Sequence, residues 1–464
     1  MKKYNMLFVF VIALGSLLPA LVHAQWLETT ITVGSYPFAL VWNSQDNKVY
    51  CANEASDNVT VIDGQTNSVI TTIPVGDYPW ALVWNSQNNK VYCVNNMSNN
   101  VTVIDGQTNS VITTIPVGIW PWALVWNSQN NKVYCANFES DDVTVIDGQT
   151  NSVITIITVG DGPCAFVWNS QNNKVYCANY WSNNVTVIDG QTNSVITTIT
   201  VGYGPYELVW NSQNNKVYCV NYYSNNVTVI DGQTNSVVTT ITVGSHPDAL
   251  VWNSQNNKVY CANEWGATVT VIDGQTNSVI TTIPVGIDPC ELVWNATNNK
   301  VYCANLSSGN VTVIDGQTNS VITTIAVGIE PWAFCWNSIQ NRVYVANIGS
   351  SSVSVIRDVT GIEEIATLPL AMTKDFEVYP NPAKSFFVVR CPSSVGKVKI
   401  YDISGKLVEE IATTTPRPRL QEGGARNDKT GELRVPLKGI KPGVYFVQAD
   451  TDTKKLIVTN WRIK

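Results

Sequence analysis

A unit of 42 residues recurs along the chain almost unchanged, and it constrains the fold more than any other feature. A tryptophan marks the same position in eight copies, namely Trp42, Trp84, Trp126, Trp168, Trp210, Trp252, Trp294 and Trp336. A period of about 20–50 residues is typical of solenoids, propellers and arrays, in which every copy forms one small structural module. The sequence therefore predicts a repetitive architecture of near-identical modules.

Each copy contains four short runs rich in apolar and β-branched residues. In the first copy these runs are residues 38–42, 48–53, 59–62 and 68–75, and segments rich in Asn, Asp and Gly separate them. No helical periodicity is present, so each copy predicts one antiparallel sheet of four strands. The second and third runs are apolar at successive positions, which indicates strands that are covered on both faces. Small four-stranded sheets repeated in this way are the blades of an all-β propeller.

The two ends of the repeat region predict how the ring closes. The last copy, residues 332–356, lacks a fourth run, whereas the chain begins with an unpaired fourth run at residues 26–33. Pairing of that run with the last copy removes an exposed sheet edge. We predict an eight-bladed β-propeller, with seven blades as the alternative. Proline in several fourth runs places them at the outer edge, since proline lacks a ladder donor.

The chain has three further parts besides the propeller. Residues 1–24 combine Lys2 and Lys3 with an apolar run and a small-residue cleavage site, which is typical of a secretory signal peptide. No other stretch is long and apolar enough to span a bilayer. We therefore expect an exported chain that starts at Gln25, a propeller over residues 25–357, a linker over 358–375 and a small C-terminal β-sandwich over 376–464.

The charge of the repeat region argues against nucleic acid as a partner. Residues 26–357 hold 9 Lys and Arg against 22 Asp and Glu. Nucleic-acid binding needs clustered Lys and Arg.

The repeat motifs resemble a known family. Residues 343–347 (Val-Tyr-Val-Ala-Asn) and 352–356 (Ser-Val-Ser-Val-Ile) are similar to the YVTN-type, YncE-like β-propeller repeat, and the Val-Gly-x-x-Pro links fit the same family. The resemblance implies the fold. It says little about function, because propellers host many unrelated activities.

The C-terminal region resembles the sorting domain of substrates of the type IX (Por) secretion system. The motif residues are Tyr379, Pro380, Asn381, Pro382, Gly405, Gly443 and Tyr445. This resemblance implies the type IX machinery as a partner and passage across the outer membrane of a Gram-negative, Bacteroidetes-like cell. The product is then secreted or attached to the outer cell surface, and cleavage of the domain stays open. A generic β-sandwich module is the alternative.

The copies differ from one another on one face only. In a blade, the link from the fourth strand to the next first strand and the loop between the second and third strands lie on the same face. These segments vary between copies, whereas the turns of the opposite face are nearly constant. We call the first of these the variable face. Loops on a rigid scaffold commonly carry binding, so we predict binding there, with random drift of the loops as the alternative.

The candidate binding residues on the variable face are aromatic or acidic, and the face has no Lys or Arg. They are Tyr36, Tyr78, Trp80, Trp120, Trp122, Tyr180, Trp181, Tyr206, Tyr222, Trp265, Trp332, Glu139, Asp248, Asp288 and Glu330. Aromatic rings supply stiff contact area and are enriched at binding hot spots. Rings beside carboxylates suit a glycan, and they suit a surface protein with a basic patch equally well.

The sequence predicts no enzyme, metal site or cofactor. The predicted mature chain has one histidine, His246. A Ser-His-Asp triad or a His-based metal site would therefore have to use this single residue, which argues against both. No phosphate-binding or dinucleotide-binding motif is present. A carboxylate pair in the central channel is a route to glycoside hydrolysis, and Asp and Asn oxygens suit Ca²⁺, but the spacing singles out neither. A hydrolase or lactonase-like enzyme and a structural surface-layer element remain the alternatives.

Three sets of repeated residues are interpreted as scaffold. Seven of the 11 cysteines share the position of Cys51, and we expect them to be small buried hydrophobes. The Trp42-type ring is expected in the core. The Lys48-type ring is expected to balance charge in solvent beside the Asp63-type ring. The remaining cysteines, Cys164, Cys290, Cys335 and Cys391, are open to pairing.

Overall fold

The computed structural model describes residues 23–360 and, further along the chain, eight strands between residues 377 and 458. The chain divides into two compact units, residues 1–362 and 363–464. Residues 1–22 of the predicted signal peptide and most of the predicted linker lie outside the described residues.

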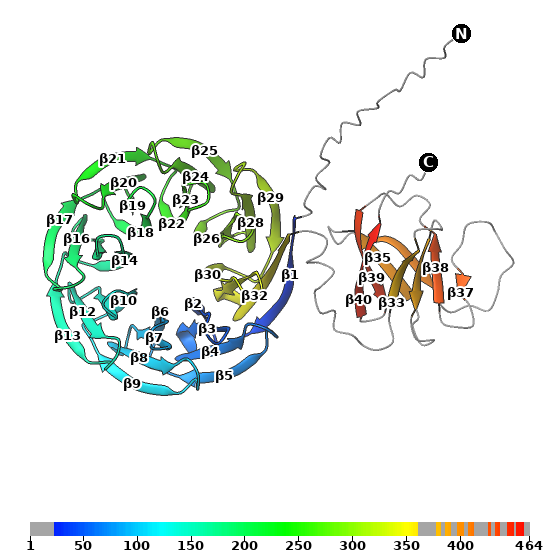
Figure 1. Cartoon of the computed structure of the whole chain (residues 1–464), viewed down its shortest axis with the longest axis horizontal. Coiled ribbons are helices and arrows are strands. Elements are labelled where there is room, and N and C mark those ends of the chain that lie inside the picture. The colour runs from blue at the N-terminus through cyan, green and yellow to red at the C-terminus, as the bar shows by residue number, and fades with distance from the viewer. Residues whose placement is uncertain are drawn as a thin grey trace, which may run out of the picture. The chain divides into compact units, whose positions relative to one another are not determined.

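The first unit is a closed ring of eight four-stranded antiparallel sheets, which confirms the eight-bladed propeller (Figure 1). The innermost strands are β2 (Pro37–Asn43), β6 (Pro79–Asn85), β10 (Pro121–Asn127), β14 (Pro163–Asn169), β18 (Pro205–Asn211), β22 (Pro247–Asn253), β26 (Pro289–Asn295) and β30 (Pro331–Asn337). The second strands are β3 (Lys48–Asn53), β7 (Lys90–Asn95), β11 (Lys132–Asn137), β15 (Lys174–Asn179), β19 (Lys216–Asn221), β23 (Lys258–Asn263), β27 (Lys300–Asn305) and β31 (Arg342–Asn347).

The third and outer strands complete each blade. The third strands are β4 (Asn58–Asp63), β8 (Asn100–Asp105), β12 (Asp142–Asp147), β16 (Asn184–Asp189), β20 (Asn226–Asp231), β24 (Thr268–Asp273), β28 (Asn310–Asp315) and β32 (Ser352–Thr360). The outer strands are β5 (Val69–Pro74), β9 (Val111–Pro116), β13 (Val153–Thr158), β17 (Val195–Thr200), β21 (Val237–Thr242), β25 (Val279–Pro284), β29 (Val321–Ala326) and β1 (His23–Thr32). Figure 1 shows these outer strands at the rim, as the proline positions predict.

The ring closes through β1, which pairs antiparallel with β32 and supplies the missing fourth strand of the eighth blade. The pairing is longer than the sequence predicts. It starts at His23, two residues before the expected mature start, and reaches Thr360. The last blade therefore extends three residues into the predicted linker, because the ten-residue β1 needs a partner of similar length.

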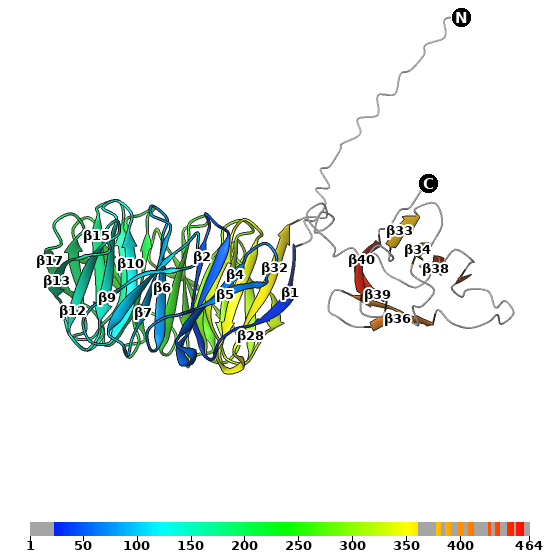
Figure 2. The same cartoon turned by 90° about the horizontal axis from the view of Figure 1, so that it is seen from below.

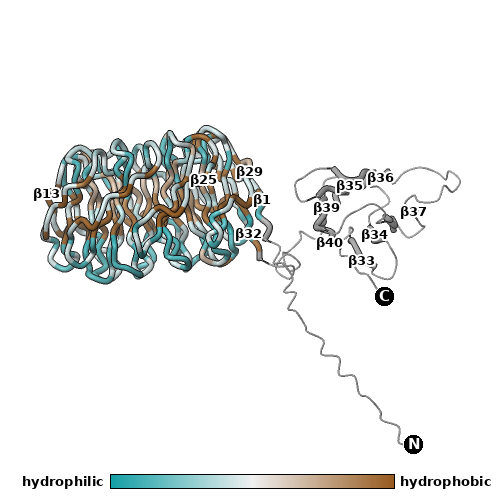
Figure 3. Tube along the Cα trace, turned by 90° about the horizontal axis from the view of Figure 1, so that it is seen from above, coloured by the Kyte–Doolittle hydropathy of each residue, from teal (hydrophilic) through white to brown (hydrophobic). Residues whose placement is uncertain are grey.

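The core lies between neighbouring blades. The second and third strands are almost fully buried, and Tyr50, Val59 and Val61 of one blade pack against Val91 and Cys93 of the next. Strands run between the two faces of the disc (Figure 2), and hydrophobic residues concentrate between the more hydrophilic faces (Figure 3). Each blade therefore buries its apolar sides only when both neighbours are present.

The repeated cysteines and tryptophans belong to this scaffold, as expected. The seven repeated cysteines are fully buried, and all ten cysteines in the described residues are free. Cys164, Cys290 and Cys335 therefore form no disulfides here, and Cys391 lies outside the described residues. The Trp42 indole packs against an inter-blade cluster and donates its Nε1–H to Asn47 Oδ1 at 3.2 Å.

The lysine ring lies beside the aspartates, as expected, and it also bonds to the backbone of the next blade, which the sequence did not predict. Lys48 Nζ donates to the carbonyl oxygens of Gly106 and Gln107, each at 2.8 Å, and to Asn109 Oδ1 at 3.1 Å. These acceptors belong to the turn between the third and fourth strands of the next blade. Each of these lysines thus joins two neighbouring blades, and the Tyr50 hydroxyl donates to the same Gly106 oxygen at 3.1 Å.

The second unit contains two four-stranded antiparallel sheets, which agrees with the predicted small all-β domain. Its strands are β33 (Glu377–Asn381), β34 (Phe386–Arg390), β35 (Lys397–Asp402), β36 (Leu407–Ala412), β37 (Arg426–Asn427), β38 (Glu432–Pro436), β39 (Gly443–Ala449) and β40 (Asp452–Val458). The orders are β33-β34-β38-β37 and β36-β35-β39-β40. Of the predicted motif residues, Tyr379, Pro380 and Asn381 lie in β33, Gly443 and Tyr445 lie in β39, and Pro382 and Gly405 lie outside the described residues.

Candidate functional site

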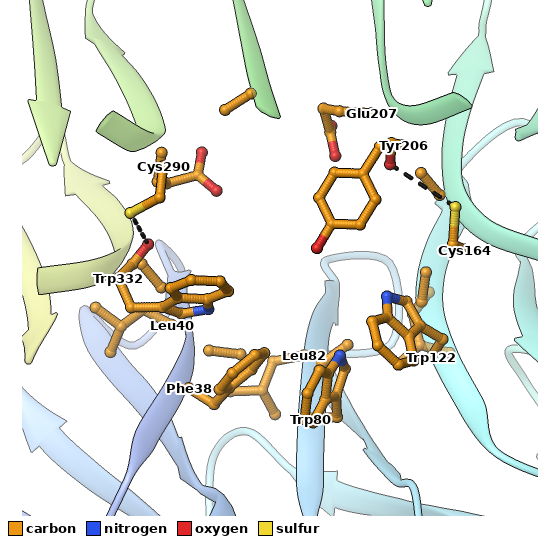
Figure 4. Close-up of a pocket in the computed structure, with 18 of the residues that line it drawn as sticks. Phe38, Leu40, Trp80, Leu82, Trp122, Cys164, Tyr206, Glu207, Cys290 and Trp332 are labelled. Atoms are coloured by element: carbon orange, nitrogen blue, oxygen red, sulfur yellow. Dashed lines mark hydrogen bonds between the residues drawn. The ribbon is translucent and has the colours of Figure 1, made fainter. Parts of the chain in front are cut away.

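The inner strands enclose a cavity of about 390 Å³ at the centre of the ring. Its wall is formed by residues near the start of these strands, so the cavity lies at the end of the axis that carries the inter-blade links. That end belongs to the variable face. The side chains that define its chemistry are Phe38, Trp80, Trp122, Cys164, Tyr206, Glu207, Cys290 and Trp332, which Figure 4 labels, together with Asp248 and Glu291.

A β-bulge at the start of the inner strands explains why consecutive residues line the cavity. In the first blade, Pro37 and Ala39 pair with adjacent residues of β3, so Phe38 is an extra residue. In the fifth blade, the irregularity covers both Tyr206 and Glu207. A bulge interrupts the alternation of side chains along a strand and re-aims a side chain. In a regular strand, the side chains of Tyr206 and Glu207 would point to opposite sides of the sheet. Because of the bulge, both side chains line the cavity.

One wall of the cavity is aromatic. The ring centroids of Phe38 and Trp80 are 3.9 Å apart, those of Trp80 and Trp122 are 4.6 Å apart, and those of Phe38 and Trp332 are 5.1 Å apart. Four adjacent blades, the eighth, first, second and third, contribute these rings. Figure 4 shows them on one side of the cavity, with Glu207 and Tyr206 on the other.

The opposite wall is acidic. Glu207, Asp248 and Glu291 come from the inner strands of the fifth, sixth and seventh blades. Within residues 25–359, every Lys and Arg other than Arg357 is the first residue of the second strand of a blade. These residues and Arg357 lie toward the face of the propeller opposite the variable face. No Lys or Arg of this described region therefore neutralises the three carboxyl groups.

Burial raises the pKa of each of the three carboxyl groups, and repulsion from neighbouring carboxylates adds to the shifts of Glu207 and Asp248. Loss of hydration inside the ring raises the pKa of Glu207 well above its usual range, and the nearby charges of Glu291 and Asp248 add to the shift. Asp248 has a raised pKa for the same first reason, with Glu264 and Glu291 as neighbours. Burial raises the pKa of Glu291 to about 7. The acidic wall thus holds protons more tightly than carboxyl groups in water do.

Aromatic rings continue from the cavity across the variable face. The centroids of Trp122 and Phe138 are 5.2 Å apart, and contacts run over the next blades until His246 stacks on Trp265 at 3.8 Å. Trp181 and Trp265 are 60% and 66% exposed, which makes them available to a ligand. We call this set the aromatic track: Phe38, Trp80, Trp122, Phe138, Tyr180, Trp181, Tyr206, Tyr222, Tyr223, His246, Trp265 and Trp332.

The residue before the first proline of each blade has a left-handed backbone, with φ between 51° and 66°. Two of these link residues are Gly162 and Gly204, and the other six are Tyr36, Tyr78, Trp120, His246, Asp288 and Glu330. A left-handed conformation costs a residue with a side chain about 1–2 kcal/mol. Six blades therefore keep large or charged side chains where glycine is favoured.

The two glycine links are filled by rings from the neighbouring loop. A Cβ atom on Gly162 would lie 2.6 Å from Trp181 Cδ1, and one on Gly204 would lie 2.9 Å from Tyr223 Cδ2. The same loops donate backbone hydrogen bonds to the links, as from Tyr180 N to Gly162 O at 2.8 Å. Link and loop thus form one surface, with the large side chain supplied by one segment or the other.

The structure sorts the predicted site residues into three groups. Those that line the cavity are Trp80, Trp122, Tyr206, Asp248 and Trp332. Those on the track outside the cavity are Tyr180, Trp181, Tyr222 and Trp265. Those on the same face that join neither group are Tyr36, Tyr78, Trp120, Glu139, Asp288 and Glu330.

The sequence interpretation missed Glu207 and Glu291 as site residues. Their position holds alanine in the other six copies, as at Ala39, so glutamate there is a departure that the repeat itself displays. Phe38, Phe138 and Tyr223 were also absent from the predicted set. Among the described residues, no three His, Cys, Asp or Glu side chains are placed to hold a metal ion. Nor does any helix in that part of the chain have the length and apolar character needed to cross a membrane.

Two solved structures share the fold of this chain at low sequence identity. The chain is similar to hydrazine synthase of Kuenenia stuttgartiensis, with 19% identity, a TM-score of 0.52 and coverage of 61% of this chain and 97% of that one. It is also similar to Sqt1 of Saccharomyces cerevisiae, with 12% identity, a TM-score of 0.64 and coverage of 72% and 99%. Likeness at this level of identity shows the fold alone. No curated protein matches the chain in sequence.

Two family models match the sequence and account for both units. The secretion system C-terminal sorting domain matches residues 377–460, which shows export through the type IX machinery and a secreted or cell-surface location. The model of the YNCE-like beta-propeller matches residues 5–294. The chain therefore belongs to the YNCE-like β-propeller family and carries a type IX sorting domain at its C-terminal end.

Proposed function

We propose that this protein is a non-catalytic binding module whose variable face holds a glycan or a surface protein. It acts on the outer surface of a Gram-negative bacterium or after release from it. The aromatic track carries the proposal, because it joins a central cavity to exposed rings such as Trp181 and Trp265. Exposed aromatic groups of this extent are unusual on a soluble surface and mark interaction sites.

The backbone of the links supports the same face. Tyr36, Tyr78 and Trp120 keep large side chains at positive φ although glycine is accepted at the same position in two other blades. Strained residues persist where the surrounding structure or the function requires them, and they cluster at ligand sites. The side chains of these links are 39–49% exposed, so packing within the fold does not require them.

The test is a binding screen against glycans and surface proteins with the exported chain. The variant is Trp181→Ala/Trp265→Ala, which removes two exposed rings without opening the core. The matched control is Ile287→Ala/Ile329→Ala, which removes two aliphatic side chains that are 60% and 62% exposed on the same face. We expect the aromatic variant to lose at least about tenfold in affinity, since such rings are worth more than 1 kcal/mol at hot spots.

An equal affinity of the aromatic variant and the control would contradict the assigned face. Self-association of the chain without any other ligand would favour the structural surface-layer alternative.

A hydrolase is the second candidate, and the acidic wall is the observation that favours it. A carboxyl group with a pKa near 7, such as that of Glu291, suits a general acid at neutral pH. Asp248 on the adjacent blade, or Glu207 one blade further, supplies the second carboxyl group that glycoside hydrolysis needs. The test is a panel of chromogenic glycosides and lactones, with Glu291→Gln as the variant. Turnover that this variant abolishes would replace the binding proposal with the enzymatic one.

A further inference from the structure

We propose that the central cavity binds an organic ammonium ion, held between the aromatic wall and the three carboxyl groups of the acidic wall. This inference rests on the proposed binding function and names the chemistry of one part of its site. The ligand class covers a quaternary ammonium group such as that of choline, or the end of a lysine side chain on a bound protein.

The aromatic wall has the composition that attracts such a cation. Tryptophan gives the strongest cation–π attraction of the aromatic residues, and the wall contains Trp80, Trp122 and Trp332 together with Phe38. Adjacent rings are tilted by 31–50° rather than stacked flat, so the wall curves around the cavity. Several ring faces around one point are the arrangement that recognises methylated ammonium groups.

Within residues 23–360, no Lys or Arg lies beside the acidic wall as a counter-ion. Glu207, Asp248 and Glu291 repel one another, and the charged groups that face them are themselves acidic. The other titratable groups that interact with them are Tyr206, Tyr180, Tyr222, Cys164, Cys219, Cys261, Cys290, Cys303 and Glu264, none of which carries a positive charge. The three carboxyl groups are half-buried, and among the described residues Glu207 and Glu291 each accept only a backbone N–H, from Leu208 and Leu292. A bound ammonium ion supplies the opposite charge that this wall does not contain.

A neutral ligand and a metal ion fit the cavity less well. A neutral sugar leaves the repulsion between the carboxylates in place. A metal ion needs three or more ligand groups that converge, and the described residues offer no such group. It also gains little from an aromatic wall, whereas the diffuse charge of an alkylammonium ion contacts rings and carboxylates together.

The two ligand types predict opposite responses to pH. An ammonium ion binds the ionised carboxyl groups, so its affinity rises as pH increases through the raised pKa values, including that of Glu291 at about 7. Binding releases protons. A neutral molecule of the same shape gains nothing from ionisation, so its affinity stays level or falls.

Isothermal titration calorimetry on the exported chain tests the inference with choline and with 3,3-dimethylbutan-1-ol, its uncharged carbon analogue. We expect choline to bind at pH 8 at least about tenfold more tightly than the alcohol, and to weaken by a similar factor at pH 5.5. n-Butylammonium tests whether a primary ammonium group is accepted in the same cavity. Titrations in two buffers with different ionisation enthalpies measure the proton release.

Variants locate the site. Glu207→Gln/Glu291→Gln keeps the shape and removes two charges, and it should abolish the preference for choline over the alcohol. Trp80→Leu should weaken choline binding by about two- to fivefold, because it removes one cation–π contact. Asp161→Asn, an exposed change on the same face, should leave binding unchanged. The wild-type comparison of choline with the alcohol keeps the test valid even where a variant fails to fold.

Three outcomes overturn the inference: no binding of choline or n-butylammonium at any pH, equal binding of choline and the alcohol, or full retention of choline binding by the Glu→Gln double variant. The proposed function fails separately. If glycans or proteins bind through Trp181 and Trp265 but ammonium ions do not, only the cavity inference is lost. If ammonium ions bind and the screen finds no larger ligand, the binding-module proposal is lost instead.

Discussion

Lys300 and Asp358 form a fully buried ion pair where the ring closes, with Nζ and Oδ1 2.6 Å apart. Asp358 also accepts hydrogen bonds from Asn295 Nδ2 at 2.7 Å and Gln25 Nε2 at 3.0 Å. In the first six blades, the equivalent lysine bonds to the turn between the third and fourth strands of the next blade. The eighth blade has no such turn, because its fourth strand comes from the start of the chain. Asp358 replaces the missing acceptors.

Loss of this carboxylate should destabilise the propeller strongly. Asp358→Asn keeps the shape of the side chain but removes the charge that balances the buried Lys300 ammonium group. Removing one partner of a buried pair costs about 3–5 kcal/mol. Thermal unfolding followed by circular dichroism should show a clear fall in Tm. Asp161→Asn, an exposed change, should stay within about 0.5 kcal/mol of wild type, and an equal effect of both variants would contradict the closure role.

The closing strand itself should contribute through its buried side chain. Ile31 of β1 is 7% exposed and packs against a cluster that includes Tyr344 and Val353. Ile31→Ala should cost about 2–5 kcal/mol, whereas Thr30→Ala, on the exposed side of the same strand, should cost less than about 0.5 kcal/mol. Denaturant titration of both variants measures the difference. Deletion of β1 should lower Tm further, and an unchanged Tm would show that the ring does not depend on β1.

The fold was predictable because the chain contains eight near-identical copies of the same strand and turn pattern. Each copy repeats its strands and turns, and the unpaired fourth run at the start of the chain specified closure. The lengths of β1 and β32 were not predictable, since their extra residues carry no repeat signature. The role of the lysines was missed because Lys48 bonds to carbonyl oxygens, which every residue possesses and no sequence pattern reveals.

The site was only partly predictable, and the β-bulge explains the gap. Variation between copies identified Trp80, Trp122 and Trp332. In a regular strand, consecutive side chains point to opposite sides of the sheet. The sequence therefore did not predict that Glu207 lines the same cavity as Tyr206. The bulge reverses that expectation. The contact between the rings of Phe38 in the first blade and Trp332 in the last blade depends on closure of the ring, so a single repeat does not reveal it.

The strain at the links predicts opposite effects for two substitutions. Tyr78 has φ 56° and a ring that is 41% exposed, so Tyr78→Gly should be more stable than Tyr78→Ala by about 1 kcal/mol. Gly162→Ala should destabilise by about 1–3 kcal/mol, because its Cβ atom meets Trp181 at 2.6 Å and its φ is 66°. Tm measurements on the three variants test both signs. A Gly162→Ala variant as stable as wild type would mean that the link backbone adapts freely.

The free cysteines should be unreactive in the folded protein. All ten in the described residues are buried, and burial raises the pKa of thiols such as Cys51 and Cys164, which lowers the thiolate fraction. Iodoacetamide should leave them unmodified in native protein and label them in urea, as read by peptide mass spectrometry. Dithiothreitol should not change Tm. Rapid labelling of Cys164 alone would show instead that the cavity wall opens.

The acidic wall should make stability fall as pH rises from weakly acidic to neutral. The pKa of Glu291 is raised from its ordinary 4.5 to about 7 because burial disfavours its charged form. The folded state therefore holds this proton more tightly than the unfolded state, so the favourable contribution is complete below pH 4.5 and is lost as pH passes 7. The change attributable to this group is on the order of 3 kcal/mol.

The variant Glu291→Gln removes this titration, so its free energy of unfolding relative to wild type should increase between those pH values. The control variant Glu139→Gln, exposed on the same face, should show the same pH dependence of stability as wild type. Urea unfolding at pH 4.5, 6 and 8 measures both differences. Parallel curves for Glu291→Gln and wild type would show that the carboxyl group is hydrated and that the wall is not a buried acidic surface.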